Sequence, residues 1–146
     1  ISEAAEPLLG CGFGVMTHLF GVQQQGNFDV PAHASSGISP DLAALGAAWI
    51  GSSPPGVTRR THIEYGACGS LSEVLGEDTL SHASVQFTQT FRPHGVEDII
   101  AFRGLNPDGT GIIVNAPSPK IVRASESFRE IWSRVATHLA AGLRLQ

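Results

Sequence analysis

Residues 97–115 read EDIIAFRGLNPDGTGIIVN and carry the clearest structural signal of the sequence. Two runs rich in β-branched and aromatic residues flank the tetrapeptide NPDG at positions 106–109. An Asp-Gly pair between two such runs is typical of the tight turn of a β-hairpin. Pro117 and Pro119 end the second run. The segment therefore predicts two antiparallel strands joined by a short turn.

After the hairpin, the spacing of apolar residues predicts a long helix over about residues 124–145. These residues recur every three or four positions and form one stripe. The stripe consists of Phe128, Ile131, Trp132, Val135, Leu139 and Leu143. Such a helix packs on its own domain, pairs with a second copy or continues as a connector. Exposure of Trp132 and Leu139 would favour pairing.

Before the hairpin, local signals predict two further helices. Ser39, Pro40 and Asp41 favour a helix start, because they suit the cap, the first helical position and the positive helix end. The buried face of this helix would carry Leu42, Leu45, Ala48 and Trp49. Ser70 and Glu73 form a capping box, which predicts a short helix over residues 70–75 that ends at Gly76.

The remaining segments give the coarse order of elements. We expect a strand over residues 13–22, an extended segment over 58–65 and a strand around 85–91. We expect a helical turn at residues 3–9 and a loop over residues 26–36, and the cluster GSSPPG at 51–56 indicates a further loop. Strands near a hairpin favour an antiparallel sheet with helices packed on it, so the fold class is α+β.

Composition limits the classes of function. The 146 residues predict one domain over 1–146, and 42% hydrophobic residues suffice for a packed core. Nine basic against 13 acidic residues give a net charge of −4, which argues against a surface that neutralises many phosphates. Lys120 is the only lysine, so no glycine-rich phosphate loop ending in Gly-Lys exists.

The sequence indicates neither a membrane anchor nor a disulfide framework. No apolar run approaches the roughly 18–20 residues that a membrane span needs, and no signal peptide is recognisable. The chain opens with Ile1 rather than Met, so we expect a fragment of a longer protein. Cys11 and Cys68 lie far apart and form no C-x-x-C pair, which fits a reducing cytoplasm.

Cys68 is the candidate nucleophile of the sequence. It lies in GACGS, residues 66–70, just before the short helix, whose N-terminus would lower the pKa of the thiol. His62 or His82 would then serve as the base, although no third orienting residue can be assigned. The simpler interpretation is a turn and a helix cap around a small buried side chain.

Two other patterns carry no defined chemistry. The run GCGFG at residues 10–14 is not a dinucleotide-binding loop, because it precedes a strand rather than following one. The histidines form no metal-ligating pattern, so no metal site is predicted. They are His18, His33, His62, His82, His94 and His138.

The aromatic residues suggest either a cavity wall or an ordinary core. Trp49, Phe87 and Phe102 are our candidates for residues that line a cavity for a small apolar ligand. The two interpretations are compatible, because a ligand cavity is often a hollow in a core. No catalytic residue and no cofactor can be assigned.

The C-terminal half resembles a known family. GVEDII at residues 95–100, GLNPDGTG at 104–111 and WSRVATHLAAGLRL at 132–145 are similar to the N-terminal sensor region of LuxR-type bacterial transcriptional regulators. That region is similar to GAF and PAS domains. The resemblance extends over about residues 60–146, and residues 66–78 look like the family's small-residue turn and short helix.

The resemblance implies an antiparallel sheet of five or six strands with flanking helices, a possible ligand pocket and a homodimer formed through the long C-terminal helix. It also implies a helix-turn-helix domain after residue 146, so any contact with DNA would belong to that part. We therefore expect a non-enzymatic domain that senses a small molecule or a redox change. The alternatives are a small enzyme that uses Cys68 and a pure dimerisation module.

Overall fold

The computed structural model describes residues 1–9, 11–22, 28–52, 56, 60, 66–76 and 82–145. Their strands form one antiparallel sheet in the order β2-β1-β5-β4-β3. The strands are β1 (Val15–Val22), β2 (Phe28–Ser36), β3 (Cys68–Ser70), β4 (Asp98–Leu105) and β5 (Thr110–Ser118). The helices are α1 (Ser2–Leu9), α2 (Pro40–Ser52), α4 (Leu71–Leu75), α5 (His82–Phe91) and α6 (Glu126–Leu143), with a 3-10 turn at Arg92–His94.

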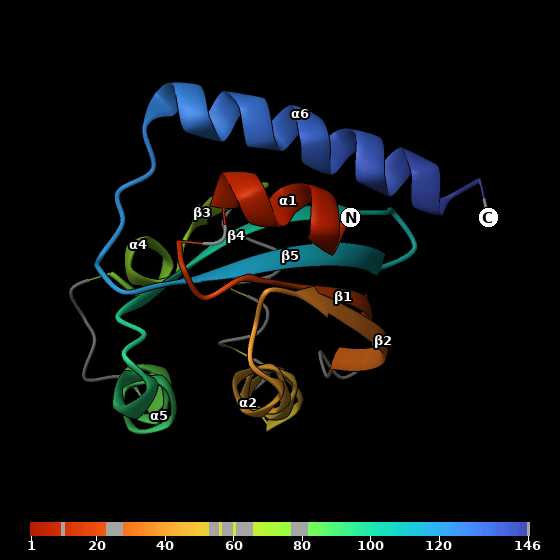
Figure 1. Ribbon diagram of the computed structural model, residues 1–146. Helices are drawn as coiled ribbons and strands as arrows, with labels where there is room; N and C mark the ends of the chain where they lie inside the picture. Colours follow the sequence, from red (N-terminus) through yellow and green to blue (C-terminus); the bar gives the residue numbers. More distant parts are fainter. Residues whose placement is uncertain are drawn as a thin grey trace.

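The helices cover both faces of the sheet (Figure 1). Helices α1 and α6 lie on one face, where their side chains join a core around Phe102 and Val114. Helices α2 and α5 lie on the other face, and a second core there contains Trp49, Phe91 and Ile99. The α+β class, the antiparallel sheet and the long C-terminal helix are confirmed.

The predicted hairpin is confirmed as β4 and β5, and β5 is the central strand of the sheet. Its turn is closed by a hydrogen bond of 2.8 Å from Asn106 N to Thr110 O. The Asp108 carboxylate accepts hydrogen bonds from Thr110 N at 2.9 Å and from its hydroxyl at 2.6 Å. Gly109 has a φ of +83°, the conformation that glycine adopts without strain.

The helix starts are also confirmed. The Ser39 hydroxyl accepts a hydrogen bond from Leu42 N at 3.3 Å, and Pro40 is the first residue of α2. Ser70 and Glu73 form the predicted capping box at the start of α4. Ser125 caps α6, which spans Glu126–Leu143 and is thus slightly shorter than predicted. The helical turn expected at residues 3–9 is α1.

Three predictions are wrong. The loop expected at residues 51–56 is helical at its described residues, which are Gly51, Ser52 and Gly56. Residues 28–36 form strand β2 rather than a loop; the prolyl residue Pro31 is tolerated because β2 lies at the edge of the sheet, where one side needs no ladder hydrogen bonds. Residues 82–91 form helix α5 rather than a strand. Phe87 and Phe91 stand four positions apart and their rings stack at 5.1 Å, so helical packing outweighs their β-propensity. The segment expected to be extended at 58–65 lies, except for Arg60, outside the described residues, and Arg60 itself is helical rather than extended.

Candidate functional site

A cavity of about 40 Å³ lies between the sheet and helices α2, α4 and α5. The sheet contributes one face of its strands, and the three helices supply the opposite wall. The described lining residues are Met16, Gly46, Trp49, Ile50, Gly69, Ser70, Leu71, Val74, Phe91, Ile99, Ala101, Arg103, Ile113 and Asn115. A space of this size holds only a few non-hydrogen atoms, whereas pockets for drug-sized ligands measure roughly 300–1,000 Å³.

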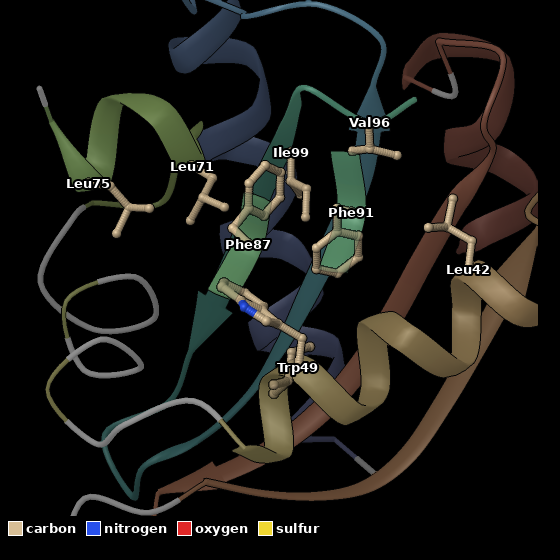
Figure 2. Close-up of a cluster of buried hydrophobic side chains, with 9 residues drawn as sticks. Leu42, Trp49, Leu71, Leu75, Phe87, Phe91, Val96 and Ile99 are labelled. Atoms are coloured by element: carbon tan, nitrogen blue, oxygen red, sulfur yellow. The ribbon is translucent and has the colours of Figure 1, made fainter. Parts of the chain in front are cut away.

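Helix α2 approaches β1 closely at one edge of the cavity. A Cβ atom added to Gly46 would lie 2.7 Å from the Met16 sulfur. One turn further along α2, the indole of Trp49 lies edge-on to Phe91, with ring centroids 6.0 Å apart. Figure 2 shows Trp49 pointing from α2 toward the two phenylalanine rings of α5. The cavity is thus bounded by a flexible thioether and by rigid aromatic rings.

The three residues predicted to line one cavity are divided between the two faces of the sheet. Trp49 lines the cavity. Phe87 packs edge-on against the Trp49 indole, with ring centroids 6.4 Å apart, and does not line the cavity itself. Phe102 lies on the opposite face, where its ring stacks on Trp132 of α6 at 4.7 Å. The structure therefore brings Trp49 and Phe87 together and separates both from Phe102.

Sequence reasoning missed the two polar groups of the β4–β5 hairpin that line the cavity. Arg103 in β4 is 6% exposed and Asn115 in β5 is 8% exposed. In the ladder Arg103 faces Ile113, while Asn115 faces Ala101, so the two polar residues are diagonal neighbours on one face. Burial lowers the pKa of the Arg103 guanidinium to about 10. Side chains alternate between the two faces of a sheet along a strand, so the sequence alone could have placed Arg103 on the face opposite Phe102.

Helix α4 lies between the cavity and the segment that leads into α6. Leu71 and Val74 point to the cavity side, where both line it. The Ser70 hydroxyl lies at the same junction and donates a hydrogen bond of 2.9 Å to the carbonyl oxygen of Val122, in the segment that leads into α6. The single turn of α4 is therefore in contact with the cavity and with the approach to the long helix.

Cys68 does not have the environment that a nucleophile needs. It lies in β3, is 4% exposed and belongs to the core on the α6 face. Burial raises the pKa of its thiol to about 11, so the expected lowering of this pKa by a helix N-terminus is wrong. The candidate base His62 and the side chain of the candidate base His82 lie outside the described residues.

Two histidines of the β1–β2 ladder face each other. His18 and His33 are paired in register, and their ring centroids are 6.2 Å apart. His18 is 1% exposed, and neither of its ring nitrogens has a hydrogen-bond partner among the described residues. Burial, and secondarily the neighbouring His33, lower the pKa of His18 to about 4. Within the described part of the chain, no three His, Cys, Asp or Glu side chains gather as a metal site.

Comparison with known proteins identifies the fold. No family model and no curated protein matches the sequence. The structure is similar to that of the GAF3 domain of Slr1393 from Synechocystis sp. PCC6803 in its photoproduct state. The TM-score is 0.61 and the identity 11%, over 99% of this chain and 89% of that chain. The chain thus has the predicted GAF-like fold. No helix among the described residues is long and apolar enough to cross a membrane.

Proposed function

We propose that this chain is a sensor domain that binds a small molecule in the cavity under α2, α4 and α5 and signals through α6. It acts by binding alone, without catalysis, within a cytoplasmic transcriptional regulator of the LuxR type. The DNA-binding helix-turn-helix domain of that regulator follows residue 146. The observation that carries the proposal is a polar network that joins one wall of the cavity to the start of α6.

The first part of the network surrounds a buried carboxylate. Asp98 is 1% exposed and opens strand β4. It accepts hydrogen bonds from the Ser72 backbone at 3.0 Å and from the Ser72 hydroxyl at 2.7 Å, both in α4. It also accepts a hydrogen bond of 2.9 Å from Val122 N. One carboxylate thus ties α4 to the sheet and to the segment before α6.

The second part reaches α6 itself. The Glu73 carboxylate accepts a hydrogen bond from Ser70 N at 3.0 Å and another from Ala124 N at 3.2 Å. It also pairs with the Arg129 guanidinium of α6 at 2.7 Å, and this arginine donates a hydrogen bond of 3.1 Å to the Cys68 carbonyl oxygen. Charge-assisted hydrogen bonds of this kind are short and directional.

This arrangement suggests how a ligand bound in the cavity changes the position of α6. A ligand that presses on Leu71 and Val74 moves α4, and Glu73 moves with it. Because Arg129 is paired with Glu73, the first turn of α6 must follow or lose the ion pair. Signalling requires that the ligand binds one position of α4 more tightly than the other.

The test has two steps. Native mass spectrometry, before and after mild denaturation, should show an added small mass that denaturation releases. Hydrogen exchange in α6 should then differ between the ligand-loaded and the stripped protein. A protein that carries no added mass and that no compound of a small-molecule library stabilises against heat would contradict the proposal and favour a pure dimerisation module.

Glu73→Gln tests the link without emptying the cavity. We expect ligand binding to persist and the exchange response of α6 to fall, because the ion pair with Arg129 is lost. Glu130→Gln is the matched control: it removes an ion pair with Arg134 that lies on the exposed surface of the same helix. An unchanged α6 response in Glu73→Gln would remove α4 from the signalling route.

We also propose that the chain forms a homodimer through α6. An apolar groove of about 350 Å³ runs between α1 and α6, and Leu8 and Ile131 at its border are 72% and 60% exposed. Exposed apolar surface of this kind is typical of interaction sites. Ile131→Glu should halve the mass measured by light scattering at micromolar concentration. Ile121→Glu, at a 50% exposed position before α6, should leave the mass unchanged.

A further inference from the structure

Arg103 is the one charged side chain among the described residues that line the cavity. It is 6% exposed and sits on β4, next to the central strand β5. The other described side chains around the cavity are apolar, apart from Ser70 and Asn115. A guanidinium in such surroundings interacts with an anion much more strongly than it would in water.

The neighbours of Arg103 define the shape of the anion that fits. A guanidinium presents a planar fork of N–H donors, which matches the two oxygens of a carboxylate. Asn115, its diagonal neighbour on β5, brings an amide that can donate a further hydrogen bond to the same space. Met16 lies directly across from Asn115 in the ladder and adds an apolar surface beside it.

The size and the apolar wall limit the rest of the ligand. The cavity of about 40 Å³ holds only a few non-hydrogen atoms. Trp49, Ile50 and Phe91 supply apolar surface around the same space. A short aliphatic tail would be removed from water there, at a gain of roughly 0.8 kcal/mol per buried CH₂ group.

We propose that the cavity binds a small monocarboxylate, with its carboxylate on Arg103 and Asn115 and a short apolar tail toward Trp49 and Phe91. This inference rests on the proposed function, because it names the ligand class of the same cavity.

The composition of the chain supplies two reporters. Met16 is the only methionine, so protein labelled with [methyl-¹³C]methionine gives a single methyl resonance, and this resonance comes from the cavity wall. The chain has two tryptophans, and Trp132 lies on α6. Trp49→Phe leaves Trp132 as the sole indole that reports on the position of α6.

The experiment titrates acetate, propionate and butyrate at pH 7 against the Met16 methyl resonance, with acetamide, propionamide and butyramide as uncharged counterparts. We expect a saturable shift with the carboxylates and at least about tenfold weaker binding of the amides. Arg103→Met, which keeps an unbranched side chain, should weaken carboxylate binding at least about tenfold. Arg92→Gln, at an arginine in an exposed ion pair, should bind as the parent protein does.

Asn115→Asp is a second test variant, and it keeps Arg103 in place. Its own carboxylate would lie diagonally opposite the guanidinium, so it should compete with the ligand and abolish the shift. Equal binding of amides and carboxylates, or undiminished carboxylate binding in both variants, would overturn the proposal.

Xenon separates failure of this inference from failure of the proposed function. If xenon under pressure shifts the Met16 resonance and alters Trp132 emission in Trp49→Phe while carboxylates do neither, the carboxylate proposal is overturned and the cavity still communicates with α6. If neither xenon nor any carboxylate reaches Met16, both the carboxylate proposal and the ligand-binding cavity are overturned.

Discussion

The two faces of the sheet are built from the same strands and packed in opposite ways. On one face, α6 lies so close to β4 that a Cβ atom on Gly104 would be 2.4 Å from the Ala136 carbonyl oxygen and 2.8 Å from the Ala140 Cβ atom. On the other face, a cavity of about 40 Å³ remains between the sheet and helices α2, α4 and α5, and the rings of Trp49 and Phe91 line it. Small residues permit the close approach of α6 at Gly104, whereas the other face keeps a space that Trp49, Phe91 and Arg103 line.

This difference suggests that the two faces of the sheet have different roles. A closely packed interface transmits displacement, because it cannot absorb strain by collapsing into empty space. A face with a cavity can accept a ligand and repack around a flexible side chain such as Met16. The face that carries α6 would then deliver the response that the other face initiates.

The largest loss of stability is expected for a substitution of Phe102. Its neighbour Ala101 points to the opposite face of the sheet and provides the comparison. Phe102→Ala removes a buried ring stacked on Trp132, so it should cost about 3–5 kcal/mol of unfolding free energy. Ala101→Val adds two methyl groups on the cavity side and should cost less than about 1.5 kcal/mol, because space exists there. Denaturant unfolding measures both. Similar costs would show that the two faces are packed alike.

Acid should lower the free energy of unfolding through His18, which is buried in β1. Its pKa is about 4 in the folded chain against about 6.5 when unfolded, so between these values the unfolded chain binds more protons. Stability from this residue is therefore fully present above pH 6.5 and is lost as the pH falls toward 4, by up to about 3 kcal/mol. Chemical denaturation from pH 7 to pH 4 measures the loss.

His18→Leu is the control for this acid effect, because leucine does not titrate. The variant should lose less stability than the parent protein over the same pH range. Parallel pH profiles for the two proteins would show that His18 is not the group responsible.

The smallest effects come from one substitution made on both faces. Gly104→Ala meets backbone and Cβ atoms of α6 and should cost about 1–3 kcal/mol. Gly46→Ala meets only the end of the Met16 side chain, and helix propensity favours alanine, so its cost should lie within about 1 kcal/mol of zero. Thermal unfolding of the pair gives the comparison. A destabilisation of Gly46→Ala as large as that of Gly104→Ala would mean that the cavity face cannot adapt.

Elements with local signals could be predicted, and elements that depend on distant contacts could not. The β4–β5 turn and the caps at Ser39 and Ser70 each involve residues a few positions apart, so the sequence displays them directly. Strand β2 contains Pro31 and small residues, and only its pairing with β1 identifies it as a strand. Helix α5 has a β-like composition, and its packing on Trp49 keeps it helical.

The candidate site follows the same division. Trp49 could be named from its place on the apolar face of a predicted helix, whereas Arg103 and Asn115 were overlooked although both lie in the predicted hairpin. Alternation along a strand shows that Phe102 and Arg103 point to opposite faces, but not which face encloses a cavity. That depends on how closely each helix approaches the sheet.

By itself, the sequence determined the α+β class, the hairpin, the capped helices and the amphipathic C-terminal helix, because periodicity and caps act over a few residues. The tertiary structure alone decided that Trp49 and Phe102 lie on opposite faces, that Cys68 is buried with a raised pKa and that Arg103 borders an apolar cavity. These features arise from contacts between segments far apart in the chain, and their energies depend on distances that only the packed fold defines.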